Sequence, residues 1–308
     1  MAKKYRSKKA VERVTNSFIY VILVIISILW LFPFVYLILQ SLRAEPGQTT
    51  SYFFPKRWTF DNYIHLFTNQ GLKYDDKGGD PYIVSTGKNN FMLWYGRTLV
   101  ISIAVTVIQT AIVLVTSYAL SRLRFKLRKP LMNLMLVLGM FPGFMAMTAL
   151  YFLLQLLGLT QNMSIVGLIL VYVGSSCMGY YICKGFFDTI PKSLDEAARI
   201  DGASRHTVFI KIILPLSKPI IIYTILTAFM APWGEYMFAS LIANGAPDYW
   251  NVAVGLRDMI QRESLRNYAD GFQRFCAGGV VVSLPITILF FLLQRYYVEG
   301  VTGGSVKG

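Results

Sequence analysis

Long apolar blocks separated by shorter polar stretches run along most of the chain. A helix needs about 20 mostly apolar residues to cross the hydrocarbon core of a bilayer, because every backbone amide there must be paired within the protein. Six blocks meet this requirement without containing a run of charges, at residues 17–41, 98–121, 131–156, 164–183, 219–243 and 276–294. The pattern predicts an all-α polytopic membrane protein with six membrane-spanning helices.

The composition agrees with this class, since 55% of the 308 residues are hydrophobic and 15% are charged. The first block follows a basic stretch, MAKKYRSKKAVERV, and so resembles a signal peptide. Its apolar core is much longer than that of a signal peptide, however, and no small-residue cleavage site follows it. We expect this segment to remain as the first membrane span.

Positive charge is distributed unevenly over the connections between the blocks. Residues 1–16 carry six Lys or Arg and residues 122–129 carry five, whereas residues 157–163 carry no charge. This is the positive-inside pattern of membrane proteins, so the net charge of +14 does not indicate nucleic-acid binding. The 42–97 connection is nearly balanced and weakens the pattern, although long translocated loops follow the rule less strictly.

The charge pattern predicts a domain organisation with both termini in the cytoplasm. The cytoplasmic parts are the basic N-terminus 1–16, the loops 122–130 and 184–218, and the C-terminal tail 295–308; the first span is 17–41; the external parts are 42–97, 157–163 and 245–275; and the core transmembrane domain is 98–294.

Residue patterns typical of catalysis are missing from the sequence. The stretch Gly174-Ser175-Ser176-Cys177-Met178 lacks the closing glycine of a nucleophile elbow, and we interpret it as close packing of small residues inside a span. The pair Gly87-Lys88 has no phosphate-binding loop around it, and the three cysteines lack metal-ligand spacing. We therefore expect no catalytic residue, metal site or cofactor in this chain.

The 184–218 loop contains signals for two short helices. Pro191 precedes a capping box in which Ser193 caps a helix and Glu196 reaches back to the cap amide. Gly202 then ends this helix, Ser204 begins a second one, and Pro215 stops it. The loop should form a rigid helix–elbow–helix unit.

The same loop resembles the EAA loop of binding-protein-dependent ABC importers. The resemblance rests on Glu196-Ala197-Ala198, Gly202, Ile212 and Leu214-Pro215, which match the motif in identity and interval. It implies that this loop holds the coupling helix that docks on an ATPase subunit, with a coupling role for Glu196, Ala197, Ala198, Asp201, Gly202, Ile212, Leu214 and Pro215. An amphipathic helix lying on the membrane surface is the alternative.

Essentially the whole chain resembles permease subunits of ABC sugar importers of the maltose/maltodextrin type (MalG-like). The most specific stretches are KGFFDTIPKSLDEAARIDGAS, FPGF, LPITILFF and the tail YYVEGVTGGSVKG. The resemblance implies the type I ABC importer permease fold and transport by alternating access. It also implies a tail contact with the ATPase subunits through Gly303, Gly304, Ser305, Val306 and Lys307; residue type alone predicts a disordered tail.

The partners implied by the resemblance are a second, homologous permease, two ATPase subunits that bind ATP and Mg²⁺, and an external sugar-binding protein. The complex would lie in the bacterial inner or plasma membrane. The resemblance also implies that the 245–275 connection touches the binding protein, although Tyr249 and Trp250 could equally belong to the aromatic belt at the membrane surface. No role is assigned to residues 71–88.

Glu235 is the only acidic residue predicted inside a span, which makes it the main candidate for a translocation pathway. A carboxylate within the bilayer must face protein or water, and Pro232 and Gly234 should break the helix beside it. Trp233 and Tyr236 complete this pathway candidate; the alternative is that Glu235 stabilises the paired permease. Pro142-Gly143 should kink the third span.

The cargo is the least determined part of the prediction. Maltose or maltodextrin is preferred, and galacto-oligosaccharides, another oligosaccharide and glycerol phosphate stay open. A polytopic membrane enzyme and a channel are alternatives of other classes: the first requires a clustered catalytic site and the second would conduct without ATP.

Overall fold

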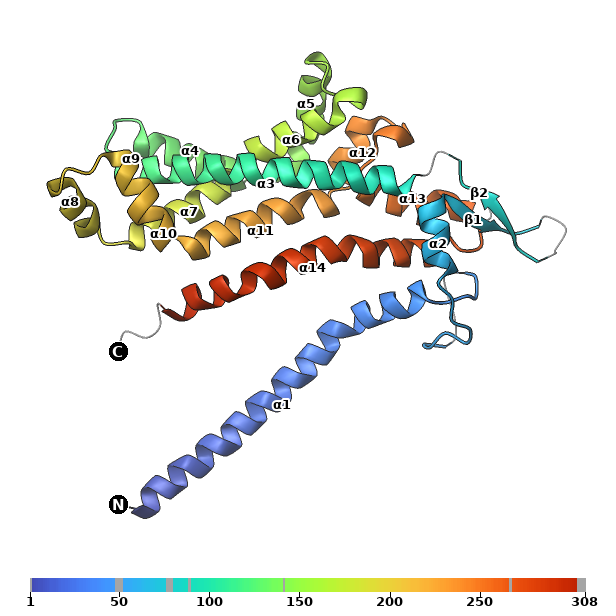
Figure 1. Cartoon of the computed structure of the whole chain (residues 1–308), viewed down its shortest axis with the longest axis horizontal. Coiled ribbons are helices and arrows are strands. Elements are labelled where there is room, and N and C mark those ends of the chain that lie inside the picture. Colours follow the sequence, from blue (N-terminus) through green and yellow to red (C-terminus); the bar gives the residue numbers. More distant parts are fainter. Residues whose placement is uncertain are drawn as a thin grey trace. The chain divides into compact units, whose positions relative to one another are not determined.

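The structure, a computed structural model, describes residues 2–47, 52–75, 80–87, 90–140, 142–265 and 268–303 (Figure 1). The chain divides into two units that we describe separately. Unit 1 comprises residues 1–85 and 259–281, and unit 2 comprises residues 86–258 and 282–308.

Unit 1 is built on a long helix, a short helix and a hairpin. These elements are α1 (Ala2–Ser41), α2 (Asp61–Thr68), β1 (Gln70–Lys73) and β2 (Tyr82–Ser85), joined by the first residues of α14 (Gly271–Gly303). The two strands are antiparallel, with Gln70 opposite Ser85. Part of the 71–88 segment, for which the sequence predicted no role, therefore forms a β-hairpin. This hairpin was not expected in an all-α chain.

Buried polar groups hold unit 1 together. The two oxygens of Asp270 lie 3.1 Å from His65 Nδ1 and 3.2 Å from Arg274 Nε, and one of them also accepts the backbone N–H of Leu72 at 2.9 Å. Asn62 donates to the carbonyls of Ser41 and Arg43. The start of α14 is thereby fixed to α2 and the hairpin.

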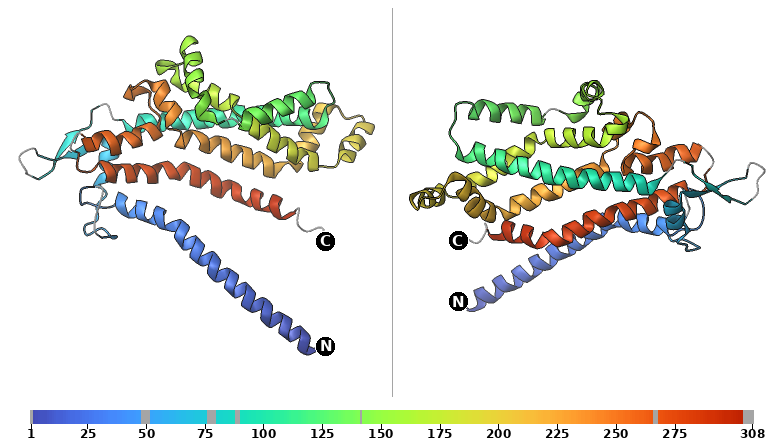
Figure 2. Two further views of the ribbon diagram at one scale, coloured as in Figure 1. Left: turned by 180° about the vertical axis from the view of Figure 1, so that it is seen from behind. Right: turned by 45° about the horizontal axis from the view of Figure 1, so that its top comes forward.

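Unit 2 contains most of the remaining helices. In chain order they are α3 (Phe91–Arg122), α4 (Arg128–Met140), α5 (Gly143–Leu156), η1 (Gln161–Met163), α6 (Ser164–Gly174), α7 (Cys177–Thr189), α8 (Lys192–Ile200), α9 (Arg205–Val208), the π-helix η2 (Phe209–Ile213), α10 (Leu214–Leu216), α11 (Lys218–Gly234), α12 (Met237–Ala243), η3 (Pro247–Tyr249) and α13 (Val252–Leu265), whose last residues belong to unit 1. Helices α7 and α11 run alongside α3 (Figure 2).

Three unbroken helices among the described residues are long and apolar enough to cross a membrane, namely α1 from Glu12, α3, and α14 as far as Tyr296. Three bent pairs raise the number to six. The bend is 100° between α4 and α5, 41° between α6 and α7, and 81° between the α9–α10 segment and α11. The six predicted spans are all present as apolar helical segments, but three of them are not single straight helices.

Several helix ends differ from the limits of the predicted spans. Helix α3 begins at Phe91 instead of residue 98, because Asn90 caps it by accepting the N–H of Leu93 at 3.1 Å. Helix α11 ends at Gly234, so the predicted span 219–243 contains a break before α12. The stretch at 174–178 lies at the break between α6 and α7, although it packs closely as expected, since a Cβ added to Gly139 of α4 would touch Met178 and Cys177.

The predicted external loop 245–275 contains helix α13 and the start of α14. Trp250 is only 3% exposed, and its ring lies 5.4 Å from that of Trp94, so it is a core residue and not part of an aromatic belt. The Trp94 ring also covers the backbone of Gly255, where an added Cβ would overlap the indole atoms. Glycine is needed at this position for the close approach of α13 to α3.

Candidate functional site: a helical elbow and a cavity at three helix breaks

The EAA segment folds as the predicted helix–elbow–helix unit, which we call the elbow (residues 192–217). Helix α8 ends after Ile200, and Gly202 reverses the chain with φ +84°, a conformation that residues with a side chain rarely adopt. Ser204 then begins α9 by accepting the N–H of Thr207 at 3.1 Å. Both predictions for the turn are confirmed.

The capping box predicted for Ser193 and Glu196 does not form. Helix α8 begins at Lys192, with Pro191 at the N-cap position and without a side-chain hydrogen bond to the cap. Proline fits there because its φ is already fixed and it has no N–H to satisfy. Ser193 consequently lies inside the first turn, and Glu196 is too far along the helix to reach the cap amide.

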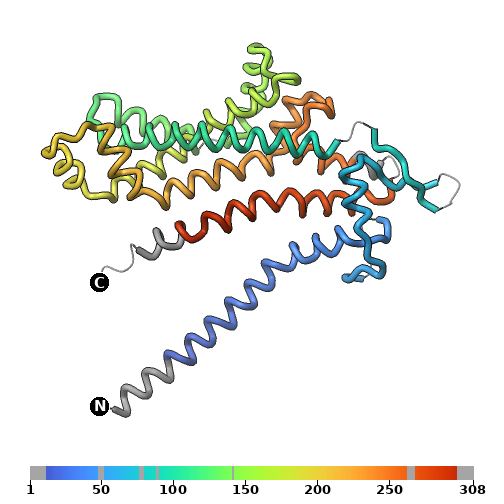
Figure 3. Tube along the Cα trace, in the orientation of Figure 1, coloured from blue at the N-terminus to red at the C-terminus, as the bar shows by residue number. Residues whose placement is uncertain are grey.

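The prediction that Pro215 stops the second helix is wrong. The chain widens into the π-helix η2, where the N–H of Leu214 bonds to the carbonyl of Phe209, and then continues through Pro215 to Leu216. The chain then bends by 81° into α11, as the course of the trace shows (Figure 3). Ser217 lies at this bend, and its hydroxyl donates to the carbonyl of Ile213 at 2.7 Å. The wider helix accommodates the proline, and the serine satisfies a carbonyl at the bend.

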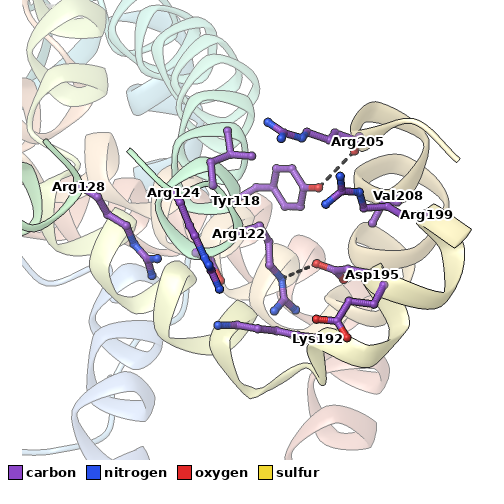
Figure 4. Close-up of a pocket in the computed structure, with 12 residues that line it drawn as sticks. Tyr118, Arg122, Arg124, Arg128, Lys192, Asp195, Arg199, Arg205 and Val208 are labelled. Atoms are coloured by element: carbon purple, nitrogen blue, oxygen red, sulfur yellow. Dashed lines mark hydrogen bonds and ion pairs between the residues drawn. The ribbon is translucent and has the colours of Figure 1, made fainter. Parts of the chain in front are cut away.

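The elbow is anchored to the ends of the neighbouring helices. Arg122, the last residue of α3, lies 3.2 Å from Asp195 of α8 and donates to the carbonyl of Ile190 at 2.9 Å (Figure 4). Tyr118 donates to the carbonyl of Arg205 at 3.2 Å. An apolar core beneath these contacts joins α3, α7 and the elbow through Val113, Leu114, Cys183, Phe187, Ile190, Val208, Phe209, Ile213 and Ile220.

The predicted coupling residues divide into two groups. Ala198, Ile212 and Leu214 are half-buried and pack against this core, so they attach the elbow to the membrane helices. The others are exposed and available to a partner: Glu196, Ala197, Asp201, Gly202 and Pro215. The elbow therefore combines a fixed base with a free outer surface.

Two exposed apolar residues of α8 were missing from the predicted set. Ile200 is 87% exposed and Leu194 is 41% exposed, although aliphatic side chains of this size are usually buried. The amphipathic pattern of the sequence KSLDEAARI could have revealed them. An uncovered apolar face on a short surface helix suits binding to another protein.

The predicted tail contact falls almost entirely beyond the described part of the chain. Gly303 is the last residue of α14, and Gly304, Ser305, Val306 and Lys307 lie outside the described residues. This contact stays a prediction.

A second feature of unit 2 is a cavity of about 820 Å³ at the breaks of three helix pairs. Pro142 and Gly143 border it at the α4–α5 break, Ser175 and Cys177 at the α6–α7 break, and residues 234–237 at the α11–α12 break. Other lining residues are Leu138, Gly139, Phe144, Ala146, Met147, Leu150, Val171, Tyr172 and Phe238. The breaks thus bring together residues that are distant in sequence.

The three predicted pathway residues occupy different environments. Glu235 and Tyr236 line the cavity. Trp233 does not; it is buried, with its ring 5.3 Å from that of Tyr95 and 5.9 Å from that of Phe229. The break after Gly234 agrees with the prediction for this stretch.

Glu235 also has a structural role at the break. Its Oε1 accepts the backbone N–H of Phe238 at 2.8 Å and so caps α12, while Asn251 donates to its backbone carbonyl at 2.6 Å. The Arg257 guanidinium lies 4.1 Å above the ring of Tyr236. These contacts hold the cavity wall in a defined conformation.

The sequence pattern does not single out Tyr172, because this residue lies in the middle of an apolar block. Its hydroxyl is buried beside the cavity and has no hydrogen-bond partner in the described part of the chain. Together with the Glu235 carboxylate and the Ser175 hydroxyl, it gives a mostly apolar cavity, which includes the Phe144 ring, a few polar groups. Such a lining suits a neutral ligand that carries hydroxyl groups. Among the described residues, no cluster of His, Cys, Asp and Glu could hold a metal ion.

Comparisons with known proteins agree with this architecture. Residues 112–303 match the family "Binding-protein-dependent transport system inner membrane component". The maltodextrin transport system permease protein MdxG of Bacillus subtilis is 34% identical over 94% of this chain and 95% of its own length. The galactooligosaccharides transport system permease protein GanQ of the same organism is 33% identical, over 94% and 95%.

A further relative and a solved structure extend the comparison. The maltodextrin transport system permease protein MalD of Streptococcus pneumoniae is 34% identical over 98% of this chain and 99% of its own length. A chain in the crystal structure of a bacterial ABC transporter involved in alginate import superposes with a TM-score of 0.70 at 21% identity, covering 92% of this chain and 97% of that chain, which supports the fold.

The matched segment contains the elbow and the cavity, and the curated relatives align over nearly their whole length. The chain belongs to the binding-protein-dependent transport system inner membrane components and is a sugar permease subunit of an ABC importer with the type I fold.

Proposed function

We propose that this chain forms part of the translocation pathway of an importer for malto-oligosaccharides and is driven by partner ATPase subunits. Two of the relatives described above are maltodextrin permeases, which supports this cargo. The cavity at the helix breaks, with Glu235, Tyr236 and Tyr172 at its wall, is the part of this chain that would meet the sugar.

The elbow is the proposed point of energy input. An ATPase subunit that binds ATP and Mg²⁺ would dock on its exposed surface, where Ile200, Glu196 and Asp201 are accessible. Motion of the ATPase would then reach α3 through the Arg122–Asp195 ion pair and the apolar core. A rigid connection of this kind can turn a push on α8 into alternating access of the membrane helices.

The remaining partners complete a heteromeric complex. We propose a second, homologous permease, two ATPase subunits and an external sugar-binding protein, with both termini of this chain in the cytoplasm. The tail from Gly303 to Lys307 would add a second ATPase contact. The single observation that carries the proposal is the exposed α8 helix reversed at Gly202 and fixed at its base.

The coupling role can be tested by Ile200→Glu in the complex reconstituted in proteoliposomes with its ATPase, second permease and binding protein. Ile200 is almost fully exposed, so a charge there should leave folding intact but weaken docking in an apolar cleft. Sugar-stimulated ATP hydrolysis and uptake of labelled maltotriose should fall together by about tenfold or more, since one buried charge costs a few kcal/mol.

Ile200→Leu is the matched control and should retain activity, because it keeps the apolar contact. Normal hydrolysis and uptake by Ile200→Glu would contradict the coupling role. The cargo is tested separately in the wild-type complex: a response to galacto-oligosaccharides without a response to maltotriose would favour the alternative represented by GanQ. Activity or conductance of the isolated chain would instead favour an enzyme or a channel.

A further inference from the structure

A second cavity in unit 2, of about 350 Å³, lies beside the elbow and is unusually basic. Its wall is formed by the end of α3, the link to α4, and helices α8 and α9 (Figure 4). Six basic and two acidic residues line it: Arg122, Arg124, Arg128, Lys192, Arg199, Arg205, Asp195 and Glu196, with Tyr118, Ser121, Leu123 and Val208. We call it the basic pocket. The volume lies within the range of small-molecule sites, about 300–1,000 Å³.

Arg122 is the buried cation of the basic pocket. Its side chain is only 4% exposed; Nε lies 3.2 Å from Asp195 Oδ2, and Nη2 donates to the Ile190 carbonyl. The remaining terminal nitrogen, Nη1, is buried and has no hydrogen-bond partner among the described residues. A buried guanidinium N–H left without an acceptor is costly, so the pocket is arranged for an additional anion.

The two carboxylates in the lining do not balance its six basic residues. Asp195 pairs with Arg122 through Oδ2, its Oδ1 is buried without a hydrogen-bond partner among the described residues, and Glu196 is the second acidic residue of the lining. Several guanidinium groups remain in a small volume, a typical arrangement for binding phosphate, because each can donate two parallel hydrogen bonds to its oxygens.

The position of the basic pocket favours a lipid over a free anion. Helix α3 ends at Arg122 and α4 begins at Arg128, so this wall lies where two apolar segments end, at the level of lipid headgroups. Exposed apolar side chains lie in the same link and along α4: Phe125, Leu127, Leu131 and Leu134. These can contact acyl chains, for which a free phosphate has no equivalent.

We propose that the basic pocket binds the phosphate of an anionic phospholipid headgroup. The headgroup would supply acceptors to Arg122 and Arg128, and its chains would follow the apolar surface of α4. Because Arg199 and Arg205 belong to the elbow, a bound headgroup would attach the elbow to the membrane surface. The basic pocket shares Asp195 and Glu196 with the proposed coupling elbow, and Arg122 with the ion pair that anchors it, but the proposal does not depend on the cargo.

The test compares two double variants of the link between α3 and α4 that remove the same charge. Arg124→Gln with Arg128→Gln alters the pocket lining, whereas Lys126→Gln with Lys129→Gln alters neighbouring residues outside the lining. The purified full-length chain would be titrated with dioctanoyl phosphatidylglycerol and bound lipid counted by native mass spectrometry. Dioctanoyl phosphatidylcholine and inorganic phosphate serve as parallel probes.

The arginine variant should bind phosphatidylglycerol about 30-fold more weakly than the wild type, since each of the two basic residues contributes on the order of 1 kcal/mol near a lipid headgroup. The lysine variant should change by less than about threefold. Wild-type protein should bind phosphatidylglycerol more tightly than phosphatidylcholine or inorganic phosphate. Arg122 is left intact because its replacement endangers folding.

Three outcomes would overturn the proposal. Equal losses in both variants would show a general surface attraction without a pocket. Inorganic phosphate binding as tightly as the lipid would make this a free-anion site. Loss of the lipid when the ATPase subunits are assembled on the chain would show that a protein surface occupies the pocket. Lipid occupancy is measured without sugar, so none of these results affects the proposed transport function.

Discussion

Gly202 and Gly255 show two different reasons for a required glycine. Gly202 has open space around its Cα, but its φ of +84° disfavours any residue with a side chain. Gly255 has ordinary helical geometry, and there the Trp94 ring occupies the space of a side chain. The first could be predicted from local sequence because a turn between two helices needs such a residue. The second could not, because Trp94 is more than 150 residues away along the chain.

The role of Glu235 follows only partly from the sequence. The sequence identified it as the acidic residue of an apolar block, and it indeed lines a cavity. The sequence did not reveal that its carboxylate caps α12, because the end of α11 beside it depends on tertiary structure.

Gly255→Ala should destabilise the folded chain by about 1–3 kcal/mol, because the new methyl group forces the Trp94 ring or α13 to move. The midpoint of thermal unfolding of the detergent-solubilised protein measures this. Gly96→Ala, on the same helix as Trp94 and with no atom within 4 Å of an added Cβ, is the control and should be neutral or slightly stabilising. An unchanged midpoint for Gly255→Ala would contradict the close contact.

At the scale of elements, hydropathy located every apolar segment but not the points where the helices break. The stretch Gly174-Ser175-Ser176 is small and uncharged, so it fits an unbroken span as well as a break. The hairpin escaped notice because strands of four residues are too short for a clear alternation. Helix α13 was not predicted, because its polar residues resemble those of a loop.

The start of each elbow helix gives a test at this scale. Ser204→Ala removes the cap of α9 and should destabilise the elbow by about 1 kcal/mol, because the N–H of Thr207 loses its acceptor. Sugar-stimulated ATP hydrolysis by the reconstituted complex should decrease, because a less stable elbow transmits the motion of the ATPase less well.

Ser193→Ala is the matched comparison, since Ser193 lies in the first turn of α8, after the N-cap residue Pro191, and the N-cap has no side-chain hydrogen bond. It should leave hydrolysis unchanged. If instead Ser193→Ala reduces hydrolysis while Ser204→Ala does not, the capping box expected from the sequence would be favoured over the observed start of α8.

At the scale of the whole molecule, the isolated chain leaves much apolar surface uncovered. The most apolar 18-residue window of α1 has no buried residue, and Trp30 is 73% exposed. A helix that is apolar all round and uncovered requires lipid or another membrane subunit. Sequence hydropathy predicted that this helix lies in a membrane, because hydropathy depends only on residue type.

The proposed orientation can be measured with single cysteines in a variant that lacks Cys177, Cys183 and Cys276. Asp80 is exposed in the 42–97 connection. Asp80→Cys should therefore react with a membrane-impermeant maleimide added to spheroplasts, whose plasma membrane is intact. Ser204→Cys in the elbow should react only after the membrane is opened, because charge asymmetry places the elbow inside. The reverse labelling pattern would invert the topology.

The meeting of three broken helices at one cavity bears on how such subunits change their cargo during evolution. Every helix end leaves main-chain donors and acceptors without partners inside the helix. A sugar hydroxyl can pair with either kind, whichever ring stereochemistry it comes from. Under the proposed transport role, a passage that met sugars partly through main-chain groups would tolerate side-chain mutation and would discriminate weakly between glucosyl and galactosyl units. We expect selection for a new diet to act mainly on the proteins that present the sugar, which fits permeases for both kinds of oligosaccharide lying at nearly equal distance from this sequence, 34% and 33% identical.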